Sequence, residues 1–143
     1  MKDIQNSDIE KIIGWMIEKK ADDVKYFDVR NKTDYTDYII LATGANELHL
    51  KAIALNVLEK AKKEDIQVLG KEGMNNAGWI LIDMGYIIAH IALPDTREHY
   101  KFDQLFDEIQ KKRIIEEGET NLDLDAEVNA VISLDLDAEI DND

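Results

Sequence analysis

The stretch WILIDMGYIIAHIAL, residues 79–93, decides the fold. It is predicted to form two apolar strands joined by a tight turn at Met84-Gly85, because strand side chains alternate between two faces. One predicted face holds Trp79, Leu81 and Asp83 of the first strand and Tyr86, Ile88, His90 and Ala92 of the second. The other face holds Ile80, Ile82, Ile87, Ala89 and Ile91. Since both faces are largely apolar, we expect a hairpin covered on two sides.

The flanking patterns predict an α/β protein: a mixed sheet of about five strands with helices packed on it. Helices are expected over 7–20, capped by Ser7, over 47–63 and over 102–113, with a short helical turn capped at Asp95-Thr96 before the last. Further strands are expected over 24–30, 37–42 and 66–69, and a loop over 71–78. The first two strands should pair antiparallel. Part of the remaining pairing should be parallel, because a helix separates the second strand from the third.

The composition is that of one ordinary domain. The chain has 143 residues, 45% of them hydrophobic, and no cysteine, which excludes disulfides, thiol catalysis and cysteine-based zinc sites. No apolar run approaches the roughly 20 residues of a membrane helix. The N-terminus MKDIQNSDIE lacks the pattern of a signal or transit peptide, so we expect a cytoplasmic protein with no membrane partner.

The formal charge of −14 is unevenly distributed. Residues 114–143 contain eleven acidic and no basic residues, whereas residues 1–113 are nearly balanced. This contrast divides the chain into a folded domain, 1–113, and an acidic tail, 114–143. Nucleic-acid affinity depends on clustered Lys and Arg, so no direct nucleic-acid specificity is expected and a protein partner is favoured.

The tail contains an internal repeat, because NLDLDAEV at 121–128 recurs as SLDLDAEI at 133–140. Its net charge favours a solvated, mobile segment. An exposed hairpin or an intermolecular strand is the alternative. The paired aspartates lack the glycine and the bidentate glutamate of a helix–loop–helix calcium site, so a metal role is not favoured.

The sequence offers no complete catalytic constellation. Thr43-Gly44-Ala45-Asn46, between a strand and a helix, is similar to a phosphate loop but has one glycine and no Lys-Ser or Lys-Thr pair, which favours a simple turn. Asp83 and His90 lack the spacing of metal ligands and a nearby nucleophile. The simpler interpretation is that Asp83 shapes the hairpin turn and His90 is a hydrogen-bonded strand residue.

An ordered set of motifs resembles the ribosomal silencing factor family, also called Iojap-like proteins. The set comprises DYIILATGANELHLKAIALNV (37–57), EG (72–73), GWILIDMGYIIAHIALPDTREHY (78–100) and FDQLFDEI (102–109). The resemblance covers about residues 4–110. It implies a mixed α/β domain with a nucleotidyltransferase-like outline, which agrees with the element order predicted above. The matching positions are Thr43, Gly44, His49, Lys51, Gly73, Trp79, Asp83, Gly85, His90, Arg97 and Tyr100.

The resemblance also implies a non-enzymatic function without a cofactor. Members of the family bind the large ribosomal subunit through ribosomal protein uL14 and sterically block subunit joining, which represses translation when nutrients are scarce. Organellar relatives act in ribosome biogenesis. The residues expected to form the partner-binding surface, or to support it, are Trp79, Leu81, Asp83, Tyr86, His90, Arg97 and Tyr100.

The chain departs from the family pattern at two positions. Tyr86 stands where an acidic residue is usual, and Phe106 stands where a tryptophan is common. Two alternatives remain open. One is a nucleotidyltransferase-like enzyme that uses the 43–46 loop for phosphates and Asp83 for a metal. The other is a self-associating module that forms a homodimer through the hairpin or the tail.

Overall fold

A computed structural model describes residues 2–112, and the acidic tail with its repeat lies outside the described residues. The helices are α1 (Lys2–Glu18), α2 (Glu47–Lys63), α3 (Pro94–His99) and α4 (Phe102–Gln110). The strands are β1 (Asp22–Asp28), β2 (Tyr38–Thr43), β3 (Gly70–Glu72), β4 (Trp79–Asp83) and β5 (Ile87–Ala92). The strands form one mixed sheet in the order β1-β2-β5-β4-β3. The predicted α/β class and five-stranded mixed sheet are therefore confirmed.

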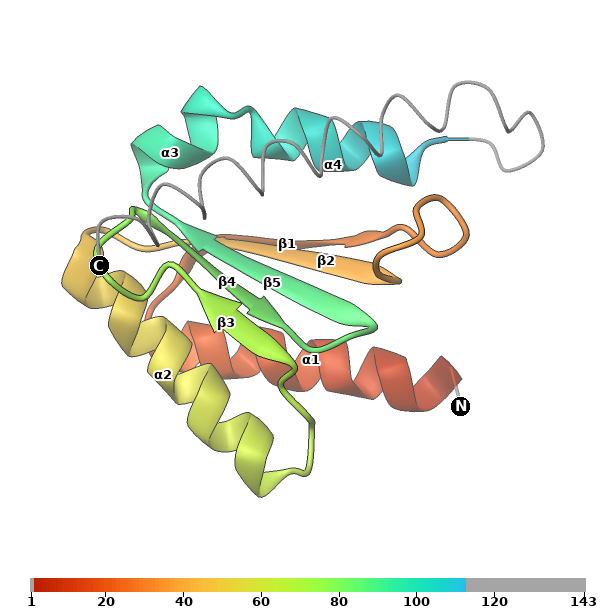
Figure 1. Ribbon diagram of the computed structural model, residues 1–143, viewed down its shortest axis with the longest axis horizontal. Helices are drawn as coiled ribbons and strands as arrows, with labels where there is room; N and C mark the ends of the chain where they lie inside the picture. Colours follow the sequence, from red (N-terminus) through yellow and green to blue (C-terminus); the bar gives the residue numbers. More distant parts are fainter. Residues whose placement is uncertain (1, 113–143) are drawn as a thin grey trace.

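The sheet separates two helical layers, as Figure 1 shows: α1 and α2 lie on one side, and α3 and α4 on the other. The α1–α2 layer covers the face that carries Ile80, Ile82, Ile87, Ala89 and Ile91. On the opposite face, Phe102, Leu105, Phe106 and Ile109 of α4 pack against Trp79 and the inward side chains of β1 and β2. The expectation that the hairpin is covered on two sides is confirmed.

The strand pairing is antiparallel at β1–β2 and β4–β5, as predicted. The parallel pair joins β2 to β5, so that Tyr38 lies opposite Ile87 and Thr43 opposite Ala92. β3 does not pair with β2, because the chain crosses to the far edge of the sheet and joins β4 there. The predicted parallel pairing exists, but its second strand comes from the hairpin.

Helix α2 has the predicted bounds because both of its ends are marked in the sequence. The Asn46 side chain accepts a hydrogen bond from the backbone N–H of His49 at the start, and Lys60, Lys62 and Lys63 lie in the last turn, where cations are favoured. By contrast, the predicted cap at Ser7 is wrong, because α1 already begins at Lys2. No proline or glycine in residues 2–6 stops the helix before Ser7.

The predicted strand over 66–69 is also wrong, since β3 covers Gly70–Glu72. Ile66 instead completes the end of α2: its N–H donates to the Ala61 carbonyl, and its side chain is buried in the core below the helix. A hydrophobic residue just after a helix often packs back in this way. Between Ile66 and β3, the N–H of Leu69 donates to the Asp83 carbonyl of the hairpin.

The segment after the hairpin differs in detail. Pro94 does end β5, but it also occupies the first position of α3, where its missing N–H costs nothing. The residue before the helix is therefore Leu93, and the predicted cap at Asp95-Thr96 is wrong. Lys101, with a left-handed φ of 53°, separates α3 from α4, which ends at Gln110 rather than near 113.

Candidate partner-binding site

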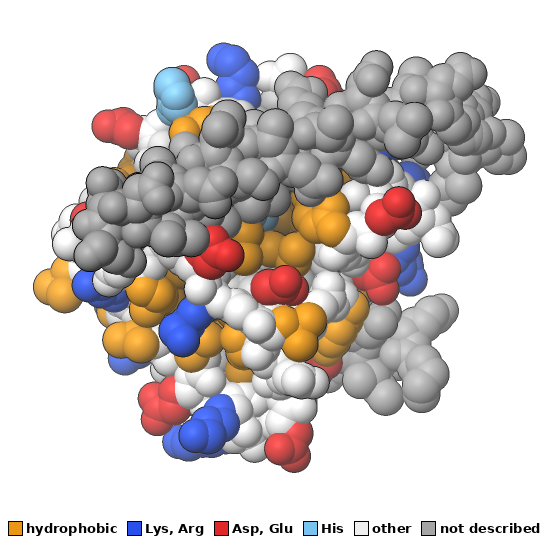
Figure 2. Space-filling view, in the orientation of Figure 1, with side chains coloured by type: hydrophobic (Ala, Val, Ile, Leu, Met, Phe, Trp, Pro, Cys, Tyr) orange, Lys and Arg blue, Asp and Glu red, His pale blue; other side chains and the backbone are white. Residues whose placement is uncertain are grey.

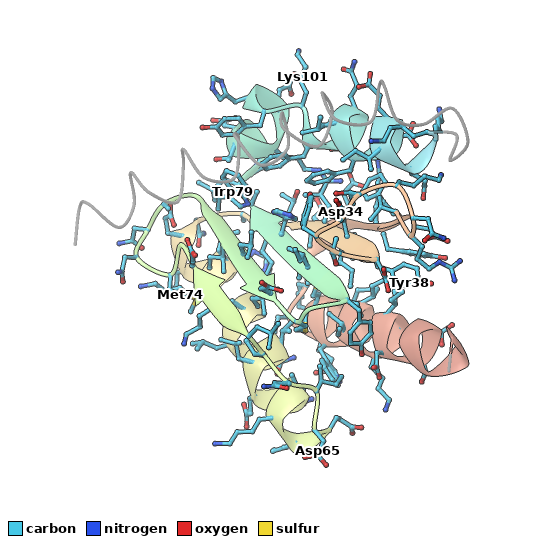
Figure 3. All side chains as sticks on the ribbon, turned by 45° about the vertical axis from the view of Figure 1, so that its right-hand side comes forward. Asp34, Tyr38, Asp65, Met74, Trp79 and Lys101 are labelled. Atoms are coloured by element: carbon cyan, nitrogen blue, oxygen red, sulfur yellow. The ribbon has the colours of Figure 1, made fainter. Side chains whose placement is uncertain are left out.

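Trp79 and His90 form the centre of the candidate site. They lie on neighbouring strands β4 and β5, and the indole Nε1–H of Trp79 donates to Nδ1 of His90 at 3.0 Å. Both side chains are buried. Figure 3 places Trp79 between the sheet and the α3–α4 layer. The predicted interpretation of His90 as a hydrogen-bonded strand residue fits this geometry.

Burial keeps the His90 ring neutral. Because Nδ1 accepts a hydrogen bond, the remaining ring proton is assigned to Nε2. Nε2 has no hydrogen-bond partner among residues 2–112, and the rings of Phe102 and Phe106 lie with their centroids 5.8 Å and 5.1 Å from the imidazole. Burial lowers the pKa of His90 from 6.5 to about 3. A cationic His90 is therefore incompatible with this packing.

Tyr100 is the partly exposed member of the same aromatic cluster. Its ring stacks on Phe102 with a centroid distance of 5.5 Å and an interplanar angle of 18°, and it lies 5.5 Å from the Trp79 ring. These contacts fix the orientation of Tyr100 before any partner binds. A rigid aromatic side chain with one exposed side is typical of interface hot spots.

Arg97 connects α3 to the first turn of α4 and to the sheet. Its side chain is buried and donates from Nε and Nη2 to the two carboxylate oxygens of Asp103, at 2.7 Å and 2.8 Å. Nη1 donates to the Asp23 carbonyl and to Oγ1 of Thr43. The Arg97 guanidinium holds the pKa of the Asp103 carboxyl well below its usual range. Asp103 is not among the predicted site residues, because its spacing from Arg97 follows no helical pattern.

Asp83 and Tyr86 flank the hairpin turn but face different neighbours. Oδ1 of Asp83 accepts the N–H of Gly85 at 2.8 Å, which agrees with the predicted role in the turn. The Tyr86 hydroxyl donates to the Asp8 carboxylate of α1, and the ring packs against the core on the α1–α2 side. The prediction that Tyr86 shares a face with His90 is therefore wrong, because Tyr86 precedes β5 and the turn breaks the alternation.

The seven predicted residues thus separate into two groups. Four of them are buried: Trp79, Leu81, His90 and Arg97. A partner cannot contact these side chains directly in this conformation, so we expect them to support the binding surface instead of forming it. Asp83, Tyr86 and Tyr100 are partly exposed. Leu81 packs with Ile88 and with Tyr35, which is not among the predicted site residues. Only Asp83 and Tyr100 combine exposure with a position on the α3–α4 side.

The 43–46 loop uses its polar groups internally. The backbone N–H of Ala45 donates to Nδ1 of His49 at 2.8 Å, and Nε2 of His49 lies 2.7 Å from the Lys19 carbonyl of α1. A Cβ atom on Gly44 would lie 2.7 Å from the Leu50 side chain. These contacts support the interpretation of the loop as a turn into α2, since the backbone amides of Gly44, Ala45 and His49 already have acceptors within the protein.

The part of the chain that the structure describes contains neither a cluster of metal-binding side chains nor a membrane-spanning helix. Residues 2–112 bring together no group of three or more His, Asp or Glu side chains that could hold a metal ion. None of the helices in this range is long and apolar enough to cross a membrane.

Comparisons with known proteins identify relatives of this arrangement. Residues 3–135 match the family model described as ribosomal silencing factor during starvation. Ribosomal silencing factor RsfS of Haemophilus influenzae is 39% identical over 87 residues, which are 61% of this chain and 85% of the relative. The mouse mitochondrial assembly of ribosomal large subunit protein 1 is 26% identical over 102 residues, which are 69% of this chain and 45% of that protein.

Solved structures agree with these relatives. A crystal structure of a Chromobacterium violaceum protein matches with a TM-score of 0.68 and 28% identity, covering 80% of this chain and 94% of the other. A crystal structure of a Bacillus halodurans protein matches with a TM-score of 0.63 and 25% identity, covering 70% and 93%. The family match, the shared motifs and the common fold lead to one conclusion: the chain belongs to the ribosomal silencing factor family.

Proposed function

We propose that this protein is a non-enzymatic translation repressor that binds the large ribosomal subunit and prevents its joining to the small subunit. Family membership is the observation that carries the proposal. The cytoplasm is the proposed location. Ribosomal protein uL14 is the proposed direct partner, and nutrient limitation is the condition in which repression is expected. The mechanism is steric, so it requires no cofactor.

The proposed contact surface lies on the α3–α4 side of the sheet, between Tyr100 and Asp83. Tyr100 packs at the Trp79 end of β4, and Asp83 lies at the other end, about 13 Å away for four strand steps. Leu81 lies between these ends on β4 and Ile88 lies opposite Asp83 on β5; both are buried and support the surface from below. A patch of this length fits within a standard interface of about 800 Å² per partner.

The support for this surface is rigidity rather than charge. Trp79, His90 and Phe102 form a close-packed layer below Tyr100, while Arg97 fixes α3 to the sheet. An interface with preorganised side chains loses less conformational entropy on binding. In Figure 2, hydrophobic side chains gather at the centre of one face of the molecule and acidic side chains lie among them, which favours a protein partner over bare RNA.

The test is co-sedimentation with purified large ribosomal subunits, repeated with small subunits present, together with a direct binding assay on isolated uL14. Wild-type protein should sediment with free large subunits and reduce the fraction of joined ribosomes. Tyr100→Ala should weaken binding by about 2 kcal/mol, roughly 30-fold, if Tyr100 is a hot spot. Tyr26→Ala is the matched control, because Tyr26 is 53% exposed on the edge strand β1, away from this surface.

The possible results of this experiment test the proposed function and the proposed contact surface separately. Failure of the wild type to sediment at physiological salt would overturn the proposed function. Wild-type binding that a folded Tyr100→Ala variant retains in full would leave the function standing and remove Tyr100 from the surface. Binding to large subunits without binding to isolated uL14 would overturn the proposed direct partner.

A further inference from the structure

A groove on the other side of the molecule has no role in the proposed function. It lies where the end of α2 approaches the edge strand β3, near Asp65 at the end of α2 in Figure 3. Its volume is about 520 Å³. We call it the lysine groove and define it by its lining residues: Leu58, Lys62, Asp65, Ile66, Gln67, Val68 and Lys71.

The lysine groove combines an apolar floor with basic side chains. Ile66 is buried and Leu58 and Val68 are half-buried, so apolar surface is accessible between the two elements. Lys62 and Lys71 are exposed, and neither makes a side-chain ion pair within residues 2–112. Other lysines of the domain do have such partners: Lys11 pairs with Glu64, and Lys60 with Glu18.

The floor and the lysines fit a segment in which apolar and acidic residues alternate. Asp65 is the acidic residue of the lining, so Lys62 and Lys71 leave the groove with a net charge of +1. In an extended segment, successive side chains point to opposite sides. A Leu-Asp alternation therefore directs leucines toward an apolar floor and aspartates toward a basic rim.

The chain itself contains this chemistry in its repeat, Leu-Asp-Leu-Asp-Ala-Glu, within a segment of charge −11. We infer that the lysine groove binds the second copy of the repeat, residues 133–140 of the same chain. Lys62 and Lys71 pair with Asp135 and Asp137, and the neighbouring leucines cover the apolar floor.

The number of residues between the domain and each copy of the repeat favours the second copy as the occupant of the groove. From Lys112, the last described residue, ten residues lead to Leu122 and 22 lead to Leu134. Fully extended, these segments span about 33 Å and about 73 Å. A domain of this size has a radius of gyration of about 13 Å and is therefore roughly 35 Å across. The first copy reaches the far side only when fully stretched, whereas the second reaches it with slack.

A weak contact is sufficient for this docking. A tethered segment experiences an effective concentration in the millimolar range, so the groove is occupied even if the free peptide binds with a millimolar dissociation constant. Ion pairs at exposed sites are screened by salt, so the occupancy should fall as ionic strength rises.

The absence of native cysteines makes the test direct. A single cysteine introduced by Asn142→Cys, just beyond the second repeat, carries a paramagnetic spin label in the full-length chain. Amide signals of residues 62–71 in the ¹⁵N-labelled protein should lose intensity. The loss should disappear in a Lys62→Glu/Lys71→Glu variant, whose exposed positions leave the fold intact, and in Asp135→Asn/Asp137→Asn.

Two matched controls carry the same charge changes elsewhere. Lys19→Glu/Lys20→Glu alters two exposed lysines that make no side-chain ion pair among residues 2–112, and Asp123→Asn/Asp125→Asn alters the first repeat. Both should retain the loss of signal. The inference is overturned if the groove signals keep full intensity or if their loss survives the Lys62/Lys71 reversal. A mixture of ¹⁵N-labelled chains without a spin label and spin-labelled chains without ¹⁵N tests for binding between copies. If the groove signals lose the same intensity in this mixture, the occupant is a second copy and the inference is overturned.

Discussion

The Trp79 indole and the His90 imidazole are joined by a buried hydrogen bond across neighbouring strands, with His90 as the acceptor. This direction fixes the tautomer and requires an uncharged ring. The same bond connects the hairpin to the aromatic layer under Tyr100, because Trp79 contacts Tyr100 and His90 contacts Phe106. The stability of the proposed binding surface is therefore linked to the protonation of a residue that a partner does not touch.

Acid should destabilise the protein through His90. Its pKa is about 3 when folded and 6.5 ordinarily, so between these values the unfolded chain binds the additional proton. The free energy of unfolding should fall as pH decreases from 6.5, with a slope of up to about 1.4 kcal/mol per pH unit from this group. Urea denaturation at pH 7, 5.5 and 4.5 measures it. His90→Gln should flatten the slope, whereas His99→Gln, at an exposed position, should not; an unchanged slope in His90→Gln would contradict the assignment.

Arg97→Ala should cost about 2–3 kcal/mol of stability, because it removes a buried guanidinium that donates to the Asp103 carboxylate and to the Asp23 carbonyl. The Asp103 carboxylate is partly exposed and keeps its bond from Lys25, so the loss stays below that of a fully buried, unpaired charge. Arg97→Lys should recover only part of this loss, since an ammonium group cannot reproduce the two parallel bonds to Asp103. Arg30→Ala is the comparison: its half-exposed pair with Asp28 should contribute less than about 1 kcal/mol. If both substitutions lower the free energy of unfolding equally, burial of the Arg97 side chain does not explain its contribution.

Gly73→Ala should be strongly destabilising. Gly73 has a φ of +86°, and a Cβ atom there would lie 2.0 Å from the Trp79 carbonyl oxygen, so the loop must move away from β4. A loss of at least about 2 kcal/mol is expected from the combined clash and backbone strain. Gly70→Ala has no atom within 4 Å of its new Cβ and should change stability by less than about 1 kcal/mol. Thermal unfolding of the two variants side by side measures the difference.

Tyr86→Phe should separate stability from ribosome binding. The substitution removes the hydrogen bond to Asp8, which ties the hairpin turn to α1, and should cost about 1–2 kcal/mol. Because Tyr86 packs toward α1 rather than toward Tyr100, affinity for large subunits should remain within about twofold of the wild type. A large loss of affinity in a folded Tyr86→Phe variant would place the binding surface on the turn instead.

The sequence was most informative where local signals and burial agree. The helix predicted over 47–63 agrees with α2, whose start Asn46 caps and whose last turn carries lysines, and the apolar alternation of 79–93 predicted the hairpin. Ile66 was misassigned because an apolar residue after a helix can either begin a strand or pack back on the helix, and only tertiary contacts decide between them.

The candidate site was less predictable than the fold. Family resemblance selects Trp79, His90 and Arg97, but it does not reveal that they are buried, because a partner contact and its support produce the same sequence pattern. The orientation of Tyr86 depends on how the turn twists away from β5. Asp103 could not be inferred, since its pairing with Arg97 depends on the angle between two short helices.

The parallel pairing of β2 with β5 has a consequence for synthesis of the chain. Paired residues lie about 50 positions apart, so β2 is made well before its central partner exists. At a translation rate of about 5–20 residues per second, the interval is roughly 3–10 seconds. During this time β2, whose six residues are all buried in the finished sheet, has only β1 beside it. The nascent domain closes only when β5 is added, and defects in β5 should therefore reduce the yield of folded protein as well as its final stability.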